Sequence, residues 1–295
     1  MTASPKSVAF DAIYQDVPAD QRDRLLRFRA THPPQHLDLA KVRWEYISGG
    51  RTGECLVILG GASGIGELAF RQLLAFEDRY RVLVPSYPAV GSMAELVAGI
   101  HGILSAERIR RVHLLGGSFG GLVAQCFVRR HPEQVASLIL SHTGLPQAGR
   151  AAKLSLLLKI LPLIPASWLR LALGREASKL VPPDHSDFAF WRAYFQDAFA
   201  GLSRRDIRAR YRCMVDLDRN YAFSGSELAD WPGSILILEA DDDPLVPQPQ
   251  RRAVRALYPR AQVYTFRGTG HASALVVPEA YGGVVLGFLR SASAG

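Results

Sequence analysis

The segment Val112–Gln125 constrains the fold of this chain more than any other part of the sequence. It reads as an apolar strand, a tight turn of the pattern G-x-S-x-G centred on Ser118, and an apolar helix. A turn this tight leaves no room for side chains beside the serine, so Gly116 and Gly120 are needed, and Gly121 lets the helix pack close to the strand. The pattern predicts a strained, projecting serine at the positive end of a helix, as a nucleophile requires.

Strand and helix signals alternate along most of the chain. Short apolar runs predict strands at 42–47, 55–59, 81–84, 112–115, 135–140, 235–238 and 262–266. Helical spacing of apolar residues lies between them, at 67–76, 93–104, 122–130, 249–257 and 279–290. The alternation predicts an α/β protein with a mostly parallel sheet flanked by helices on both faces.

The same signals divide the chain into three parts. Residues 1–40 are polar and helix-like, and they predict an N-terminal helical extension. Residues 41–145 and 231–295 carry the strand signals and form the predicted core. Residues 146–230 lie between two core strands and show no strand signal. They predict a helical cap inserted at the carboxyl edge of the sheet, where it would cover the ligand crevice.

The predicted cap is apolar and interrupted by prolines. Residues 153–161 are strongly apolar, and aromatic residues recur from Phe188 to Phe199. The prolines break the segment into short helices, which depend on tertiary packing for their stability. We therefore expect a mobile cap with one face in the crevice, and we expect Trp191 and Phe195 to influence substrate choice.

A serine nucleophile needs a general base, and His271 has the most suitable context among the eight histidines. It stands in a glycine-containing loop after the last predicted strand. The base needs an acid that fixes its tautomer. Three aspartates follow the strand at 235–238, with Asp243 the first candidate and Asp242 the second. His142, at the end of another strand, is a candidate pocket residue.

The tetrahedral intermediate of acyl transfer needs two hydrogen-bond donors for its oxyanion. The candidates are the backbone N–H of Phe119, directly after the serine, and that of Ala62, in the loop after the strand at 55–59. The glycines of 61–66 also resemble a phosphate-binding turn, but no acid ends the next strand, as a dinucleotide site requires. No cofactor is therefore predicted.

Charge and cysteine content argue against several other classes. The formal charge of +8 comes mostly from arginines that are scattered rather than gathered around a reading motif, so no nucleic-acid partner is predicted. Weak attraction to anionic membranes or substrates stays open. Three distant cysteines without a CxxC pair predict neither a metal nor a redox site. No signal-peptide core and no apolar run of about 18 residues occur, so we expect no membrane span and a cytoplasmic location.

The elbow around Ser118, the segment Asp243–Pro247 and the Gly270-His271 loop together resemble the α/β-hydrolase superfamily over roughly residues 40–290. The chain resembles the maspardin-like branch through the stretches Phe28–Thr31, Phe70–Leu74, Tyr80–Val82, Ser86–Pro88, Gly117–Gln125 and Leu257–Pro259. The resemblance implies the α/β-hydrolase fold.

Three functions compete within this resemblance. The first is a serine hydrolase that cleaves an ester or thioester of a small to medium apolar acyl substrate through an acyl-enzyme. Maspardin-like proteins are in part binding partners, so a non-catalytic adaptor is the second, although the complete triad of Ser118, Asp243 and His271 favours catalysis. The third is a cofactor-free haloperoxidase or C–C hydrolase on the same triad. Gly60-Gly61 replaces the His-Gly of many hydrolases, which leaves the substrate class open.

Overall fold

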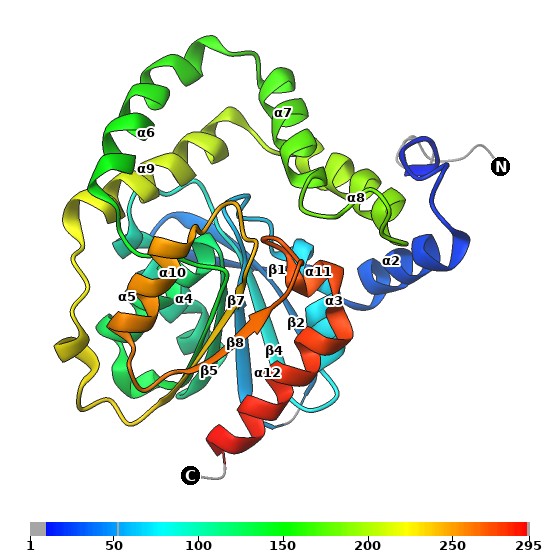
Figure 1. The fold of residues 1–295 in the computed structure, drawn as a ribbon. Helices are drawn as coiled ribbons and strands as arrows, with labels where there is room; N and C mark the ends of the chain where they lie inside the picture. The colour runs from blue at the N-terminus through cyan, green and yellow to red at the C-terminus, as the bar shows by residue number, and fades with distance from the viewer. Residues whose placement is uncertain (1–9, 52, 294–295) are drawn as a thin grey trace.

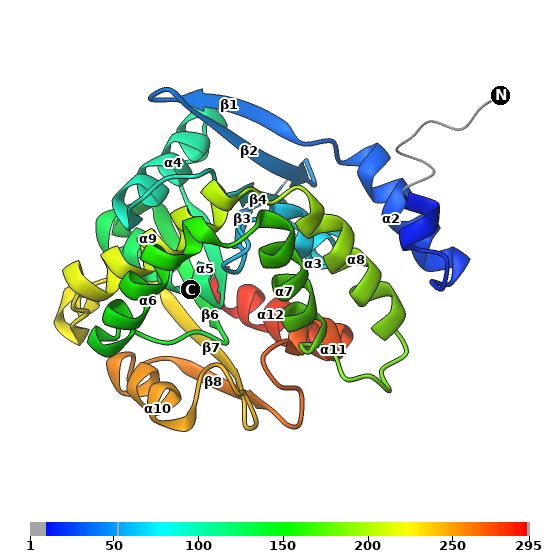
Figure 2. The same ribbon diagram turned by 90° about the horizontal axis from the view of Figure 1, so that it is seen from above.

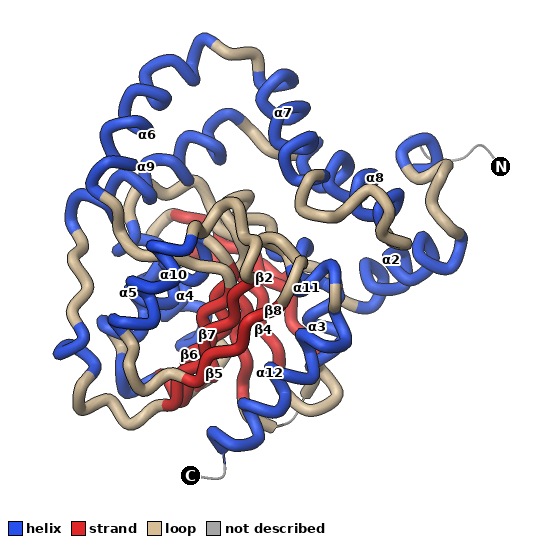
Figure 3. Tube along the Cα trace, viewed as in Figure 1, coloured by secondary structure: helices blue, strands red, loops and turns tan. Residues whose placement is uncertain are grey.

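The computed structural model describes residues 10–51 and 53–293. Within them, eight strands form one sheet in the order β1-β2-β4-β3-β5-β6-β7-β8 (Figure 1; Figure 3). The strands are β1 (Gln35–Leu39), β2 (Val42–Gly49), β3 (Cys55–Leu59), β4 (Arg81–Ser86), β5 (Val112–Gly117), β6 (Val135–Ser141), β7 (Ser234–Ala240) and β8 (Gln262–Phe266). β2 pairs antiparallel with β1 and β4, and the other neighbouring pairs are parallel.

Helices cover both faces of this sheet (Figure 2). Those around the core are α2 (Ala19–Thr31), α3 (Phe70–Phe76), α4 (Met93–Ala106), α5 (Phe119–Arg130), α10 (Gln248–Leu257), α11 (Ser273–Val276) and α12 (Pro278–Ser293). Those between β6 and β7 are α6 (Ala148–Ile160), α7 (Ala166–Ser178), α8 (Phe188–Ala200) and α9 (Arg204–Asn220). Short 3-10 turns include η1 (Gly66–Ala69) and η3 (Leu161–Leu163).

Each face of the sheet buries its own apolar layer. All five residues of β3 are buried. Val57 and Leu59 join the cluster that contains α4 and α5, whereas Leu56 and Ile58 join the cluster that contains α3 and α12. A strand with helices on both faces is apolar at every position, and for this reason β3 appears in the sequence as a continuous run rather than an alternation.

One strand, β1, was not predicted from the sequence. The expectation of a helical extension over 1–40 was wrong at Gln35–Leu39, which forms β1 and pairs with β2. The turn between the two strands is Ala40-Lys41, and both residues have positive φ, 48° and 67°. Such hairpin turns usually contain Asn-Gly, so this one leaves no local signal. Residues 1–9 of the predicted extension lie outside the described residues.

The segment between β6 and β7 arches over the carboxyl edge of the sheet (Figure 1). Its helices are unequally buried. α8 has six buried residues and belongs to the same cluster as α2, α3 and α12. In α6 only Ala151 is buried, and in α7 no residue is. Arg29 of α2 also bridges α8 to the core, because it donates to Asp197 at 2.9 Å and to Glu67 at 2.7 Å.

The expected role of Trp191 does not fit this packing. Trp191 is 1% exposed, and its ring lies 6.2 Å from that of Phe70 and 5.8 Å from that of Tyr194. Two cavities lie near Ser118, and neither Trp191 nor Phe195 is among the described residues that line them. Both side chains therefore belong to the core, because the aromatic face of α8 turns toward α3 and α2.

Replacing Trp191 by alanine should lower the free energy of unfolding by about 3–5 kcal/mol, because it removes a large buried ring and leaves a cavity. Urea unfolding monitored by circular dichroism measures the change. The matched control is Trp168→Ala, since Trp168 is 70% exposed and its loss should change stability by less than about 0.5 kcal/mol. Equal effects of the two substitutions would contradict the core assignment of α8.

Candidate active site

Ser118 lies at the turn between β5 and α5, in a conformation that few residues adopt. Its φ is 52° and its ψ is −117°. The neighbouring glycines make the turn possible. A Cβ on Gly120 would lie 2.0 Å from the carbonyl oxygen of Leu59, and one on Gly116 would lie 2.5 Å from that of Gly120. A larger residue at 120 would push the turn away from β3, and one at 116 would push the start of α5 away from β5, so the sequence pattern has a direct steric cause.

The backbone of Ser118 is held from the adjacent strand. Its N–H donates to the carbonyl of Ser141 at 2.9 Å, and its carbonyl accepts from Thr143 Oγ1 at 2.7 Å and from the N–H of Gly121 at 3.0 Å. Thr143 also occupies the space next to Gly121, where a Cβ would lie 2.5 Å from its own. These contacts hold the strained residue in place.

His271 reaches Ser118 from the loop after β8. Its Nε2 lies 2.9 Å from Ser118 Oγ, and its Nδ1 lies 2.8 Å from Asp243 Oδ2. The Asp243 carboxylate only accepts, so Nδ1 carries the proton and Nε2 accepts from the serine hydroxyl. The imidazole is mostly buried, with 7% of its side chain exposed, and the Asp243 side chain is fully buried. The structure thus brings the three predicted residues together.

The three consecutive aspartates after β7 have three different partners. Asp241 accepts from the N–H of Gly268 at 3.0 Å, and Asp242 accepts from that of Gly270 at 2.9 Å. Both glycines have positive φ, so the two carboxylates fix the backbone of the loop that carries His271. Asp243 alone of the three contacts the imidazole.

Asp243 is stabilised as a carboxylate. Burial by itself would raise its pKa, but the hydrogen bond and the charge of His271 outweigh burial. The N–H groups of Leu245 and Val246 also donate to its Oδ1, at 2.8 and 3.0 Å. The pKa of Asp243 therefore lies below its usual value, and the group is an acceptor at neutral pH.

A buried chain of hydrogen bonds lies behind His271, and sequence reasoning did not find it. Tyr281 donates to Ser141 Oγ at 3.0 Å, Ser141 Oγ lies 3.0 Å from His142 Nδ1, and His142 Nε2 lies 2.8 Å from Ser273 Oγ. A neutral imidazole has one donor nitrogen and one acceptor nitrogen, so all hydrogen bonds of this chain can be formed with their donors pointing the same way. The members come from β6, α11 and α12, so no local pattern connects them. Only His142 was a candidate pocket residue, and it does line the cavity at Ser118.

The pKa of His142 is lowered to about 4, first by burial and then by the charge of His271. The unfolded chain, with a histidine pKa of 6.5, therefore binds this proton more tightly than the folded protein does. The stability that comes from the neutral state of His142 should be fully present above pH 6.5 and should be lost as the pH falls toward about 4. Between about pH 7 and 5, the free energy of unfolding of His142→Gln should fall by about 2 kcal/mol less than that of the native protein. Urea unfolding across this range checks it, with exposed His36→Gln as the control. An unchanged pH slope in His142→Gln would contradict the assignment.

Two adjoining cavities lie at this edge of the sheet. One of about 180 Å³ is lined by Ser118, His271, Gly60 and Gly61, together with residues of α11 and α12. A second, of about 260 Å³, begins at Ala62 and is mostly apolar. Its further lining includes Leu173, Ala177, Leu180, Phe199, Leu202 and Ile207. Leu180 lines both cavities, so the predicted oxyanion loop lies between the serine and an apolar chamber roofed by the inserted helices.

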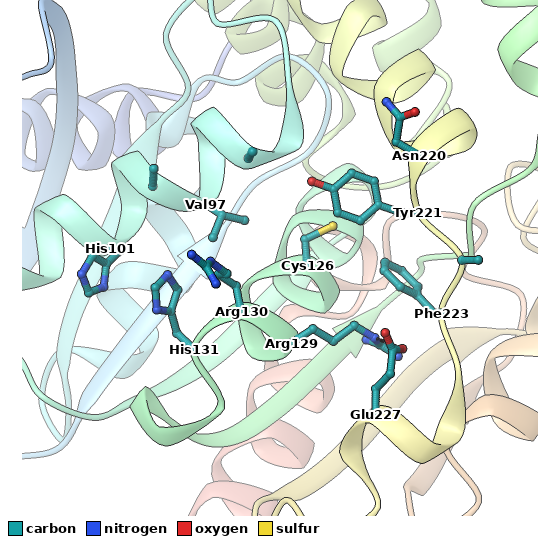
Figure 4. A pocket seen from close by; sticks show the side chains of 13 residues that line it. Val97, His101, Cys126, Arg129, Arg130, His131, Asn220, Tyr221, Phe223 and Glu227 are labelled. Carbon is teal, nitrogen blue, oxygen red and sulfur yellow. Dashed lines mark hydrogen bonds and ion pairs between the residues drawn. The ribbon is translucent and has the colours of Figure 1, made fainter.

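A larger hollow of about 480 Å³ lies elsewhere, between α4, α5 and the segment after α9 (Figure 4). Figure 4 shows the rings of His101 and His131 side by side, and they stack with centroids 4.4 Å apart. Arg129 points toward Glu227 and pairs with it at 2.7 Å. Among the described residues, none lines both this hollow and the cavity at Ser118, so it is not part of the same site.

Sheet order, the elbow after β5 and the histidine loop after β8 define a protein of the α/β-hydrolase fold, as predicted. The chain matches the alpha/beta hydrolase family over residues 56–283. It belongs to that family. Among the described residues, no helix is long and apolar enough to cross a bilayer.

Comparison with known sequences supports the maspardin-like prediction. Human maspardin is 34% identical over 124 residues, which cover 39% of this chain and 40% of maspardin. The match thus spans less than half the length of that relative. RutD of Escherichia coli is 26% identical over 267 residues, covering 80% of this chain and 91% of RutD.

Solved structures show the same fold at low sequence identity. A hydrolase from Pseudomonas aeruginosa PA01 superposes with a TM-score of 0.74 at 20% identity, covering 87% of this chain and 98% of that one. The enol-lactonase from Burkholderia xenovorans LB400 gives 0.70 at 16% identity, over 87% of this chain and 100% of that one. A thermophilic esterase from Thermogutta terrifontis gives 0.73 at 17% identity, over 88% and 98%.

Proposed function

We propose that this protein is a serine hydrolase that cleaves an ester or thioester of a small to medium apolar acyl substrate. The observation that carries the proposal is the continuous contact from Asp243 through His271 to Ser118, with distances of 2.8 and 2.9 Å. Nucleophile, base and orienter are thus within hydrogen-bond reach of one another, which is the geometric requirement for nucleophilic acyl transfer.

The reaction follows from these contacts. Ser118 Oγ attacks the carbonyl carbon while His271 Nε2 takes the hydroxyl proton, and Asp243 stabilises the resulting imidazolium. Collapse of the tetrahedral intermediate breaks the bond to the alcohol or thiol, which leaves with the proton from His271. A water molecule then gives a proton to His271 and attacks the acyl-enzyme. The second tetrahedral intermediate breaks its bond to Ser118 Oγ and releases the acid, while His271 returns the proton to the serine.

The oxyanion is assigned to two backbone donors, as the sequence suggests. The N–H of Phe119 is in the first turn of α5, where the helix dipole also favours negative charge. Ala62 follows Gly60 and Gly61, which line the cavity at Ser118. An acyl group bound at these donors would extend past Ala62 into the apolar cavity under α7, so that cavity is assigned to the acyl chain. The inserted helices 146–230 thereby act as the cap over this group.

The alternatives predict different behaviour. A non-catalytic adaptor does not need a serine hydroxyl placed 2.9 Å from a histidine that is itself oriented by a buried carboxylate, so the geometry favours an enzyme. A haloperoxidase or C–C hydrolase would use the same three residues, and the substrate decides between those reactions.

Hydrolysis of p-nitrophenyl esters from acetate to laurate tests the proposal. The apolar cavity of about 260 Å³ should favour short and medium chains over long ones. Matching thioesters, monitored by release of the free thiol, determine which bond is preferred. Failure to hydrolyse any ester or thioester, together with no labelling by a fluorophosphonate, would overturn the proposal.

A further inference from the structure

The bend between α6 and α7 carries an unusual concentration of exposed apolar side chains. We define the cap apex as residues 153–175, and Figure 1 shows it projecting farther from the sheet than the rest of the insertion. Five of the nine large apolar side chains exposed in the described chain belong to it: Leu156, Ile160, Leu163, Trp168 and Leu171. Leu163 is 82% and Trp168 70% exposed. An apolar surface of this kind marks an interaction site.

The charge of the cap apex has one sign. From His142 to Arg175 the sequence contains no aspartate or glutamate. Its basic residues within the apex are Lys153, Lys159, Arg170 and Arg175. Among the described residues, none of these four has an acidic partner within ion-pair distance. The nearby Arg150 is neutralised by Asp218 at 2.7 Å. The surface is therefore complementary to an occupant that is both apolar and anionic.

Helix α7 presents two different sides, one toward the apolar cavity and one outward. Leu173 and Ala177, one turn apart, line the apolar cavity assigned to the acyl chain. Trp168, Leu171 and Arg175 lie on the other side of the helix and face outward. The outer surface beside them is hollowed, with a volume of about 500 Å³, and its lining includes Arg170, Arg175 and Arg192. Arg192 also approaches Asp16 at 3.8 Å.

We propose that the cap apex docks on an anionic lipid surface. Leucines and a tryptophan on a bend flanked by lysines and arginines match the chemistry of a bilayer interface, where apolar groups enter the acyl region and cations meet phosphates. The hollow with three arginines provides space for a headgroup beside the inserted side chains. A second copy of the chain would bring two surfaces of the same charge together, which disfavours self-association through this face. The proposal does not depend on the hydrolase activity.

The protein contains an intrinsic reporter for this docking. Trp44, Trp191 and Trp231 are 1%, 1% and 5% exposed, so Trp168 alone of the four tryptophans meets solvent. Vesicles of phosphatidylglycerol and phosphatidylcholine in equal parts should shift the emission of Trp168 to the blue and sediment the protein. Vesicles of phosphatidylcholine alone should do neither, and high salt should weaken the binding.

Leu163→Asp should reduce sedimentation with the anionic vesicles by about tenfold or more, because it places a negative charge on the inserted tip. Leu26→Asp, the same change at an exposed leucine of α2, is the matched control and should bind as the native protein does. Equal binding to both vesicle types, or an equal effect of the two substitutions, would overturn the proposal. A dimer in size-exclusion chromatography that Leu163→Asp dissociates would also overturn it, in favour of self-association.

Discussion

Replacing Ser118 by alanine is expected to reduce turnover on the order of 10⁶-fold, because the acyl-enzyme can no longer form. The same variant should lose fluorophosphonate labelling. Stability should change by less than about 1 kcal/mol, since alanine keeps the Cβ of serine and loses only one hydrogen bond, to His271. Ester hydrolysis with purified protein, followed by mass spectrometry of the labelled serine, measures both effects.

The control for Ser118 is Ser273→Ala. Ser273 is also buried beside the site, where it contacts His142 and Thr269 rather than the reacting hydroxyl. It should keep fluorophosphonate labelling at Ser118. Labelling that persists in Ser118→Ala would show that another residue is the nucleophile, and the proposed reaction would then be wrong.

Replacing Asp243 by asparagine should reduce turnover by about 10⁴-fold while leaving the fold intact. The amide donates a hydrogen bond where the carboxylate only accepts, so His271 is held in the tautomer that protonates Nε2. That nitrogen then donates toward Ser118 and no longer accepts the hydroxyl proton. The loss should appear in kcat more than in KM, because substrate contacts are unchanged.

Asp242→Asn is the matched comparison one residue earlier. Asp242 accepts from the N–H of Gly270 and does not contact the imidazole. An asparagine keeps a carbonyl acceptor there, so the effect on turnover should be far smaller than that at Asp243. A severe loss in Asp242→Asn with a mild one in Asp243→Asn would move the orienting role to Asp242.

Local features of the site were accessible from the sequence, because each has a steric or chemical reason within a few residues. The elbow needs glycines at 116 and 120, and Ser118 is fixed between them. The position of Asp243 was open between two neighbours, because a run of acids after a strand does not reveal which side chain turns inward. In the structure, Asp241 and Asp242 accept hydrogen bonds from backbone N–H groups of the loop that carries His271.

Features that depend on tertiary packing were not accessible. The segment of α8 is helical, as expected of the predicted cap, but its aromatic residues suit a crevice-lining face and a core face equally, and Trp191 lies in the core. The Ala40-Lys41 hairpin lacked its usual residues. The chain from Tyr281 to Ser273 through His142 joins three separate elements, and only their assembly creates it.

The positive φ of Ser118 also bears on how this sequence can change. A residue with a side chain at this conformation is destabilising by about 1–3 kcal/mol, whereas glycine adopts positive φ readily. The elbow is thus locally frustrated: the residue best suited to the backbone is not the one that carries the hydroxyl. Folding stability alone would favour glycine at this position, so the serine of this sequence is not explained by the stability of the turn.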